Sequence, residues 1–307
     1  RVYFVRPFLI QCIFCVLVYF TSAESLPMAK PEAVGLDPKK LEAVDEKMEA
    51  LIEENRLTGG TVVIARKGKV AHFETYGLRN LEEELPVEKD TIFRIYSMTK
   101  AITSMAALML WEEERLELDD PLSKFFPSLK KMKVWKDGNL IDTEREATIA
   151  DLLRHTSGLT YGWMSSKPIR EALRSAGVLD RNKKLVPESK ANRFAANYNY
   201  RDGKLTMIDD PTTSKYLEEP AFKSPGGGLC STATDYMRFL LMIEKGGKFE
   251  GKKYLSKKSV KLMTTNQIPR GAGWVTFGDQ VRQGVGFGHG FSVRVKTSKW
   301  DPNGRVG

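Results

Sequence analysis

The sequence is poor in the residues that bind metals or form disulfides. It holds three cysteines and three histidines among 307 residues. Two cysteines, Cys12 and Cys15, lie near the beginning, so Cys230 is alone in the rest of the chain and no internal disulfide is expected there. Cys230 stands beside glycines and a leucine and is predicted to be a small core residue. The histidines show no metal-ligand spacing, so we predict no metal and no cofactor.

Signals for nucleotide or nucleic-acid binding are also missing. The glycine-rich stretch 225–228 lacks the residues of a phosphate-binding loop. The net charge of +9 comes from interspersed lysines and arginines, with the densest cluster at Lys130, Lys131, Lys133 and Lys136 and no interleaved ladder of aromatic residues. We interpret this cluster as a solvated basic face and expect no nucleic-acid partner.

The chain has one long apolar run, at residues 8–20. Arg1 and Arg6 precede it and small residues up to Ala23 follow it, which is typical of a secretory signal peptide. Residues 1–23 are therefore expected to be a signal-peptide-like segment, and the protein to be secreted or periplasmic if that signal is genuine. The run is short for a transmembrane helix. A signal anchor is one alternative. Because the chain begins with Arg1 and not with Met, two others are part of a longer leader and translated sequence that the mature protein does not carry.

The strongest indication of chemistry is Ser97 followed three residues later by Lys100. In a helix, positions i and i+3 lie on one face, so the hydroxyl and the amine can share a proton. A serine becomes a good nucleophile when a base removes its proton, and a lysine serves as that base when burial or positive potential destabilises its ammonium. The pair predicts acyl transfer, with Ser97 as nucleophile and Lys100 as base.

The S-x-x-K pattern alone is not specific, because Ser128 and Lys131 repeat it. That second copy lies in a short lysine-rich segment and is predicted to be solvated surface. Ser97 instead precedes apolar residues at helical spacing, which predicts that it opens a buried helix. These apolar residues are Ile102, Met105, Ala106, Met109 and Leu110. Capping of that helix is the alternative role for Ser97.

Local patterns predict further elements and give two histidines structural roles. His72 is expected within a strand, and His155 is expected to close a short helix that Gly158 stops in the left-handed conformation. The predicted elements are a helix over 38–55, a hairpin of 61–66 and 70–76 with a glycine turn, a short helix over 148–154, a helix over 236–243 capped by Thr232 with Asp235, and bent strands over 273–295.

Three segments together resemble the serine β-lactamase-related family, in its class C and esterase branch. They are residues 96–100, 152–159 and 225–235, and the resemblance extends over residues 31–307. It implies an α+β fold, with an antiparallel sheet flanked by helices and a helical lobe. It also implies that Ser97 attacks a small-molecule ester or lactam, that Lys100 moves the proton, that water releases the acyl group, and that the Ser97 amide is one oxyanion donor.

The sequence departs from the family pattern twice. The helical lobe lacks the tyrosine of a Y-x-N or Y-S element, because the family segment that would hold this element is absent near residues 184–186. We do not assign the role of this tyrosine to Tyr161, Tyr198, Tyr200 or Tyr254. The chain also stops at residue 307, before the strand expected to carry the K-T-G equivalent. We therefore expect an incomplete domain, without the last strands and part of the lobe, and little or no turnover by the chain as written.

Three functions remain open at this point. The first is a serine hydrolase acting on esters or β-lactam-like amides through an acyl-enzyme on Ser97. The second is a non-catalytic relative, a pseudoenzyme or truncated gene product. The third is a D-alanyl-D-alanine peptidase, which uses the same nucleophile.

Overall fold

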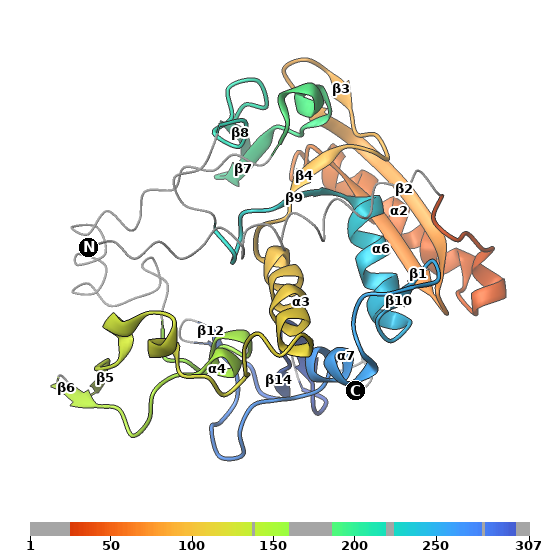
Figure 1. The fold of residues 1–307 in the computed structure, drawn as a ribbon. Coiled ribbons are helices and arrows are strands. Elements are labelled where there is room, and N and C mark those ends of the chain that lie inside the picture. Colours follow the sequence, from red (N-terminus) through yellow and green to blue (C-terminus); the bar gives the residue numbers. More distant parts are fainter. Residues whose placement is uncertain (1–24, 137–138, 160–185, 219–223, 278–279, 299–307) are drawn as a thin grey trace. The chain divides into compact units, whose positions relative to one another are not determined.

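The structure is a computed structural model that describes residues 25–136, 139–159, 186–218, 224–277 and 280–298. Helices and antiparallel strand pairs are mixed along these residues (Figure 1), which confirms the α+β class. The chain divides into two compact units. The first unit holds residues 1–99 and 181–252, and the second holds residues 100–180 and 253–307.

The first unit contains a three-stranded sheet, several strand pairs and two long helices. Its elements are η1 (Pro31–Val34), α2 (Pro38–Glu53), β1 (Gly59–Arg66), β2 (Lys69–Asn80), β3 (Leu85–Pro86), β4 (Ile92–Arg94), η2 (Tyr96–Met98), η5 (Glu188–Arg193), β7 (Asn197–Arg201), β8 (Lys204–Asp209), β9 (Cys230–Thr232), α6 (Ala233–Glu244) and β10 (Lys248–Phe249). The sheet has the order β1-β2-β3.

The second unit is built on α3, whose first residue is the last residue of the first unit. Its elements are α3 (Thr99–Glu112), η3 (Leu122–Lys124), η4 (Pro127–Leu129), β5 (Lys133–Lys136), β6 (Asn139–Asp142), α4 (Ile149–Leu153), α7 (Lys257–Thr264), β12 (Thr276–Phe277), β13 (Gln280–Val281), β14 (Val285–Phe287) and β15 (Ser292–Arg294). β11 (Lys252–Lys253) pairs with β10 where the units meet along the chain. The short strands β12 to β15 confirm the strands predicted over 273–295.

Helix α2 begins where the sequence predicts. Asp37 has an extended backbone and its carboxylate accepts a hydrogen bond from the Lys39 amide at 3.0 Å, so it is the N-cap. Pro38 at the first helical position has no amide hydrogen to leave unsatisfied. The helix ends at Glu53, two residues before the predicted end, because Asn55 takes a left-handed φ of 54°.

The predicted hairpin is formed by β1 and β2. Their register runs from Gly59 opposite Gly77 to Arg66 opposite Lys69. Lys67 and Gly68 between them have φ values of 53° and 72°, as in the type I′ turns that suit the twist of antiparallel strands. Glycine is also required at Gly77, where a Cβ atom would lie 2.3 Å from a backbone oxygen. This hairpin is the main part of the first unit's sheet.

Strands β4 and β9 bring two distant segments of the first unit together. Ile92 lies opposite Thr232, and Arg94 lies opposite Cys230. Thr232 is also the N-cap of α6, because its hydroxyl accepts a hydrogen bond from the Asp235 amide at 3.1 Å, which confirms the predicted cap. The pairing places the glycine-rich segment before β9 beside the end of β4.

One glycine and one carboxylate join elements of the second unit. A Cβ atom at Gly288 would lie 2.0 Å from the Met263 carbonyl oxygen of α7, so this close approach requires glycine. Glu112, the last residue of α3, accepts hydrogen bonds from the Ser256 amide at 2.7 Å and from the Ser259 hydroxyl. Burial alone would raise the pKa of Glu112, but these hydrogen bonds outweigh it and lower the pKa. Buried apolar residues of this unit include Met105, Leu108, Leu110, Leu255, Val260, Met263 and Val293.

Within the described ranges, no helix is both long enough and apolar enough to cross a bilayer. The same residues include no group of three or more His, Cys, Asp or Glu side chains placed to hold a metal ion. The signal-peptide-like segment of residues 1–23 lies outside the described residues and stays a prediction.

Candidate active site

Ser97 is the middle residue of η2, a 3-10 turn that runs directly into α3. Ser97 and its neighbours Tyr96 and Met98 are all exposed. Tyr96 has a φ of 40°, in a region that residues other than glycine rarely occupy and that costs on the order of 1 kcal/mol. Its hydroxyl accepts a hydrogen bond from the Asn197 amide at 2.6 Å. The turn thus presents Ser97 to solvent at the beginning of a helix, as predicted.

The segment before β9 holds the Ser97 turn on both sides. The Ile95 amide donates to the Leu229 carbonyl at 3.1 Å, and the Leu229 amide donates to the Thr99 hydroxyl at 3.1 Å. Thr99 and Leu229 are buried, so each of these hydrogen bonds is shielded from water. The backbone on either side of Ser97 is therefore fixed by one segment from more than a hundred residues later in the chain.

Arg94, three residues before Ser97, is the centre of a buried polar network. Its guanidinium donates to the Ala195 carbonyl at 2.6 Å, to the Ser214 hydroxyl at 3.2 Å and to the Asp209 carboxylate. Two aromatic rings lie over it, at 3.9 and 5.1 Å from the ring centroids. The Arg94 hub consists of Arg94, Phe194, Ala195, Asp209, Ser214 and Tyr216. It connects β4 to the segments around β7 and β8.

Lys100 lies in the first turn of α3 and is half-buried. The boundary between the two units falls between Thr99 and Lys100, so Ser97 and Lys100 belong to different units. Along the chain they remain three residues apart, in a 3-10 turn that continues as a helix.

His155 is placed next to α4, as predicted, but it stops the helix itself. It has a φ of 61°, its amide donates to Leu152, and the Thr156 amide donates to the Asp151 carbonyl at 2.8 Å, which is a Schellman motif. The prediction that Gly158 provides the left-handed stop is therefore wrong. Gly158 is left-handed too, with a φ of 76°, but it lies in the following turn.

His155 is exposed as a residue, but its ring packs edge-on against Phe287, with 4.8 Å between ring centroids. Desolvation of the ring lowers the pKa of His155, and the positive charge of Lys100 lowers it further. Both effects favour the neutral imidazole, and both act within the second unit.

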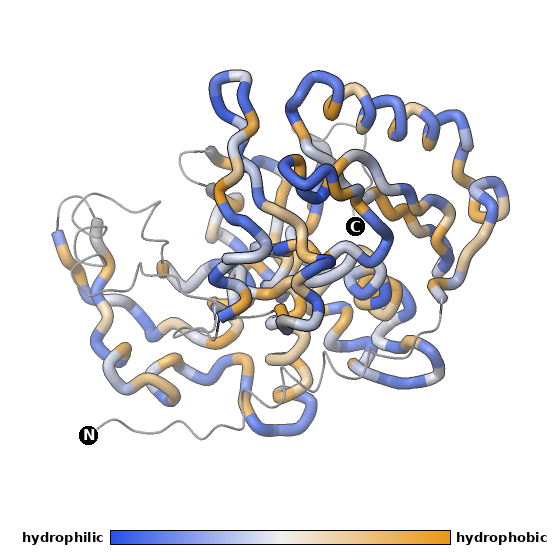
Figure 2. Tube along the Cα trace, turned by 90° about the horizontal axis from the view of Figure 1, so that it is seen from above, coloured by the Kyte–Doolittle hydropathy of each residue, from blue (hydrophilic) through white to orange (hydrophobic). Residues whose placement is uncertain are grey.

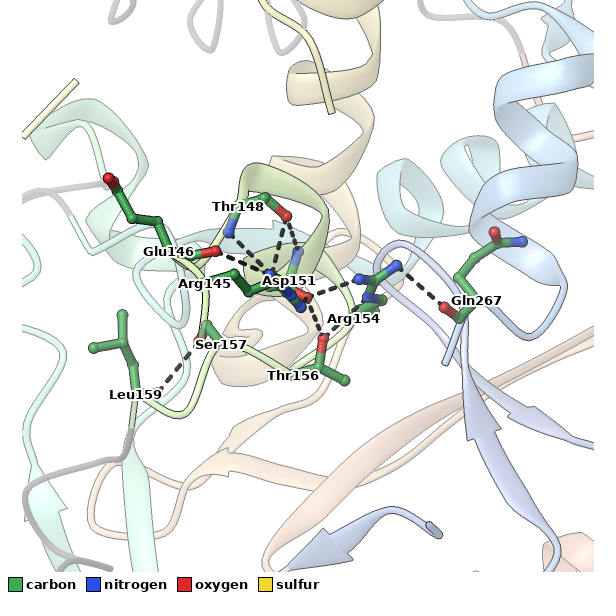
Figure 3. A network of polar contacts seen from close by, with 9 residues as sticks. All are labelled: Arg145, Glu146, Thr148, Asp151, Arg154, Thr156, Ser157, Leu159 and Gln267. Atoms are coloured by element: carbon green, nitrogen blue, oxygen red, sulfur yellow. Dashed lines mark hydrogen bonds and ion pairs between the residues drawn. The ribbon is translucent and has the colours of Figure 1, made fainter. Parts of the chain in front are cut away.

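Asp151 is the centre of a second network, in and around α4 (Figure 3). Its carboxylate, with a side-chain exposure of 0%, accepts from Arg154 at 2.7 Å, from Arg145 at 3.0 Å, from the Thr156 hydroxyl at 2.8 Å and from the Thr148 amide at 3.0 Å. Burial alone would raise the pKa of Asp151, but the two arginines and the other donors hold the pKa well below its usual range. The Asp151 hub consists of Arg145, Thr148, Asp151, Arg154 and Thr156.

Neither hub was predicted from the sequence, although the Asp151 hub has a signal that can be read there. Thr148 and Asp151 form a full capping box at the start of α4, and the T-x-x-D spacing that indicates it is readable in the sequence. The Arg94 hub left no such signal, because the hydrogen-bond partners of the Arg94 side chain lie 101 to 120 residues later in the chain.

His289 is a further residue for which no role was predicted. It is buried, and neither ring nitrogen has a hydrogen-bond partner among the described residues. Burial lowers its pKa to about 4, and the nearby Arg154 charge contributes to this shift. His289 is therefore a neutral imidazole at pH 7.

The other singled-out residues lie where their structural interpretations placed them. Ser128 and Lys131 are exposed, in and just after η4. His72 is buried in β2, with Nε2 3.0 Å from the Asp45 carboxylate. Cys230 is half-buried in β9.

Some predictions about the missing tyrosine concern residues outside the described ranges. Tyr161 and the apparent jump near 184–186 fall in or at the edge of residues 160–185, outside the described residues. Tyr198 and Tyr200 lie on β7 in the first unit. The Tyr198 hydroxyl donates to the Glu82 carboxylate and accepts from the Leu81 amide at 2.8 Å, so it is already engaged.

Comparison with known proteins finds similar sequences in bacteria. Protein Rv1367c from Mycobacterium tuberculosis (strain ATCC 25618 / H37Rv) is 29% identical over 311 residues, covering 80% of this chain and 77% of that protein. Esterase EstB from Burkholderia gladioli is 36% identical over 135 residues, covering 44% of this chain and 33% of EstB. Teichoic acid D-alanine hydrolase from Staphylococcus aureus is 27% identical over 212 residues, covering 60% of this chain and 48% of that enzyme.

Solved structures share the fold at low sequence identity. Unliganded simvastatin synthase LovD from Aspergillus terreus has a TM-score of 0.65 and 19% identity, with 85% of this chain and 84% of LovD covered. EstCE1, a hydrolase with promiscuous acyltransferase activity, has a TM-score of 0.63 and 19% identity, with 83% and 82% covered. These similarities confirm the β-lactamase/transpeptidase-like fold that the sequence predicted.

A family profile described as Beta-lactamase matches residues 44–203, more than half of the 307-residue chain. The match contains the Ser97 turn, Lys100 and the Asp151 hub. The sequence segments at 96–100 and 152–159, which first indicated the relationship, lie inside it. The chain therefore belongs to the beta-lactamase family, in its serine β-lactamase-related group.

Proposed function

We propose that this protein is a serine hydrolase that cleaves small-molecule esters or β-lactam-like amides through an acyl-enzyme on Ser97. The Ser97 oxygen attacks the carbonyl carbon while its proton passes to the neutral amine of Lys100. Lys100 then gives this proton to the departing alkoxide or amine. Water attacks the acyl-Ser97 ester, the carboxylic acid leaves, and the Ser97 hydroxyl is restored.

The observation that carries the proposal is the exposed 3-10 turn that presents Ser97 one helical turn before Lys100. The hydrogen bonds at Ile95 and Thr99 hold this turn in place, which favours a fixed nucleophile. The strained φ of Tyr96 is of the kind that clusters at active sites. We assign the backbone amide of Ser97 as one donor to the developing oxyanion.

Lys100 is assigned as the base because of its position. It lies in the first turn of α3, three residues after Ser97, and a general base must lie close to the proton that it takes. We give His155 a structural role as the residue that ends α4.

The relatives support the substrate class. EstB is named an esterase, the Staphylococcus aureus relative is named a teichoic acid D-alanine hydrolase, and a relative from Penicillium citrinum is named a methylbutanoyltransferase. These names share the breaking or exchange of an acyl bond. We therefore favour esters of small molecules over amides as substrates of this chain.

The chain offers a matched control for the nucleophile, because its second S-x-x-K lies in an exposed 3-10 turn as well. We expect a fluorophosphonate probe to label one serine per chain, and mass spectrometry of the peptides to locate it at Ser97. Ser97→Ala abolishes the label and Ser128→Ala keeps it. Lys100→Met slows labelling by roughly 10²- to 10⁴-fold, the usual contribution of a general base, while Lys131→Met leaves the rate unchanged. Labelling that persists in Ser97→Ala contradicts the proposal.

A non-catalytic relative is the second candidate. It is favoured by the engagement of Tyr198, whose hydroxyl is held by Glu82 and Leu81 in the first unit. Hydrolysis of p-nitrophenyl butyrate, followed in parallel with labelling, separates the two candidates. Turnover that disappears in Ser97→Ala establishes the enzyme, whereas neither labelling nor turnover establishes the non-catalytic relative.

A further inference from the structure

The segment of residues 193–197 lies alongside the part of the chain that leads to Ser97. Its contacts link Arg193 with the Asp90 carbonyl, Phe194 and the Ala195 amide with Ile92, the Ala195 carbonyl with Arg94, and the Asn197 side chain with Tyr96. Each contact joins positions 101 to 103 apart in the chain. The bridge between Ile92 and Phe194 is parallel. The two segments therefore run side by side, in the same direction, up to the residue before Ser97.

Among these contacts, Asn197 supplies the one nearest to Ser97, at the point where its segment leaves the core. Phe194 and Ala195 are buried, whereas Asn197 is half-buried. The hydropathy changes accordingly, from apolar at residues 194–196 to strongly polar at Asn197, as the colouring along the trace in Figure 2 shows. Nδ2 of Asn197 donates a hydrogen bond to the Tyr96 hydroxyl oxygen at 2.6 Å. Continuing the apolar run by one residue would remove this hydrogen bond.

The β7–β8 hairpin connects Asn197 with the Arg94 hub. Asn197 begins β7 and lies opposite Asp209, the last residue of β8, and Asp209 binds Arg94. The register of the two strands shifts directly after Asn197, as at a β-bulge, a feature that redirects side chains. One strand pair thus contacts the chain at two positions, three residues and one residue before Ser97.

Tyr96 needs such support because of its backbone conformation. Its φ of 40° is unfavourable for a residue with a Cβ atom, and a conformation of this kind persists only where the surroundings fix it. The peptide plane that follows Tyr96 carries the Ser97 amide, so rotation about ψ of Tyr96 would turn that amide. A contact that fixes Tyr96 therefore also fixes the direction of the Ser97 amide.

We propose that Asn197 is a positioning residue for the reaction of Ser97. By holding the Tyr96 hydroxyl, it keeps Tyr96 in its left-handed conformation and aims the Ser97 amide and hydroxyl at the substrate carbonyl. This inference rests on the proposed function of Ser97. It implies that loss of the Asn197 amide and loss of the Tyr96 hydroxyl have one and the same effect on the reaction. It also implies that a residue able to adopt a φ of 40° without strain makes Asn197 dispensable.

A cycle of variants tests this coupling through the rate at which a fluorophosphonate probe labels Ser97. Asn197→Ala and Tyr96→Phe are each expected to slow labelling about fivefold, in line with the loss of one hydrogen bond, and the double variant to be no slower than either. Asn197→Asp is expected to recover most of the rate, because its carboxylate can accept a hydrogen bond from the Tyr96 hydroxyl. Asn199→Ala, at an exposed position of the same strand, leaves the rate unchanged.

The Tyr96→Gly background separates positioning through Tyr96 from a merely structural role of Asn197. In this background the φ of 40° is unstrained and the hydroxyl is gone, so Asn197→Ala is expected to change the labelling rate by less than twofold. Unchanged labelling in Asn197→Ala alone, multiplied effects in the double variant with Tyr96→Phe, or equal slowing by Asn197→Ala in both backgrounds overturns the proposal.

Hydrogen exchange followed by mass spectrometry gives a readout that does not need a reactive Ser97. The Met98 amide donates to the Ile95 carbonyl at 2.9 Å and closes the turn that contains Ser97. This amide is expected to exchange about fivefold faster in the two variants that break the Asn197 contact than in the parent chain and the control, while residues 101–110 of α3 exchange equally in all four. A parent chain that the probe leaves unlabelled refutes the proposed function, and the exchange then decides this inference separately. Faster exchange at Met98 supports positioning by Asn197, and unchanged exchange overturns it.

Discussion

The Arg94 hub and the Asp151 hub each bury an ionic group, but they stabilise it by different means. The Arg94 guanidinium contacts one carboxylate, two neutral hydrogen-bond acceptors and two aromatic faces. Its Nε atom has no hydrogen-bond partner among the described residues. Asp151 relies on hydrogen bonds and ion pairs alone.

The difference reflects the chemistry of the two groups. A guanidinium is planar and weakly hydrated, so aromatic faces replace part of its hydration. A carboxylate has no such option and must receive a donor at each of its lone pairs when it is desolvated. We therefore expect the Asp151 hub to fail sharply when one charge is removed, and the Arg94 hub to lose stability more gradually.

Asp151→Asn is expected to have the largest effect. It leaves the mostly buried Arg154 guanidinium without its carboxylate, and breaking a buried pair in this way costs about 3 to 5 kcal/mol. Urea denaturation followed by circular dichroism measures the loss. The control is Asp142→Asn, whose side chain is 87% exposed and whose removal changes stability by less than about 0.5 kcal/mol. A loss below about 1 kcal/mol for Asp151→Asn contradicts the comparison.

Arg94→Met is expected to cost less, about 2 kcal/mol, by the same measurement. The methionine keeps an apolar contact with the two rings, and the Asp209 carboxylate, at 25% exposure, is hydrated once the guanidinium is gone. Arg201→Met removes an exposed guanidinium from the same unit and serves as control. If Arg94→Met costs more than Asp151→Asn, the aromatic faces do not have the compensating role assigned to them.

The pH dependence of stability is a further test of the Asp151 hub. The folded pKa of Asp151 lies below the unfolded value of about 3.9, so its contribution to stability is complete well above pH 4 and is lost as the pH falls toward the folded value. The stability difference between the parent chain and Asp151→Asn should therefore narrow by about 1 kcal/mol between pH 6 and pH 3. The loss of stability caused by charging His289 occurs in both proteins and cancels. A difference that stays constant over this range contradicts the assigned pKa direction.

The smallest effects are expected for the hydroxyl groups of the hubs. Ser214 is fully buried and its oxygen bonds to Arg94, Asp209 and the Tyr216 amide, so Ser214→Ala is expected to cost about 1 to 2 kcal/mol. Thr156 is half-buried, so Thr156→Val is expected to cost about 1 kcal/mol. Thermal denaturation measures both losses of stability, and a larger loss for Thr156→Val than for Ser214→Ala contradicts the expectation.

Elements with local signals could be predicted from the sequence, and long-range pairings could not. Asp37 with Pro38 indicates the start of α2, and Gly68 indicates the β1–β2 turn, because each of these residues acts on its own backbone. The pairing of Ile92 with Thr232 leaves no such signal, since nothing near either residue specifies a partner 140 positions away. The end of α4 was mispredicted because His155 adopts a conformation that glycine ordinarily supplies.

The candidate site shows the same limit. Ser97 and Ser128 both lie in exposed 3-10 turns and both precede a lysine by three residues. Only η2 continues into a 14-residue helix. The S-x-x-K pattern and exposure do not distinguish the two serines, whereas the apolar residues at helical spacing after Ser97 and the family resemblance do. The hydrogen bonds that fix its turn come from Leu229, which no inspection of residues 90–105 reveals.

The carboxylate of Glu112 gives α3 a property that reaches far from its reactive end. Lys100 and Glu112 lie about 18 Å apart along the helix, at 1.5 Å per residue. Glu112 accepts hydrogen bonds from the amide of Ser256, the N-cap of α7, and from the Ser259 hydroxyl within α7, so α3 cannot rotate about its axis or slide without breaking its connection to α7. A random-mutagenesis screen for altered turnover should therefore return substitutions at Glu112, Ser256 and Ser259.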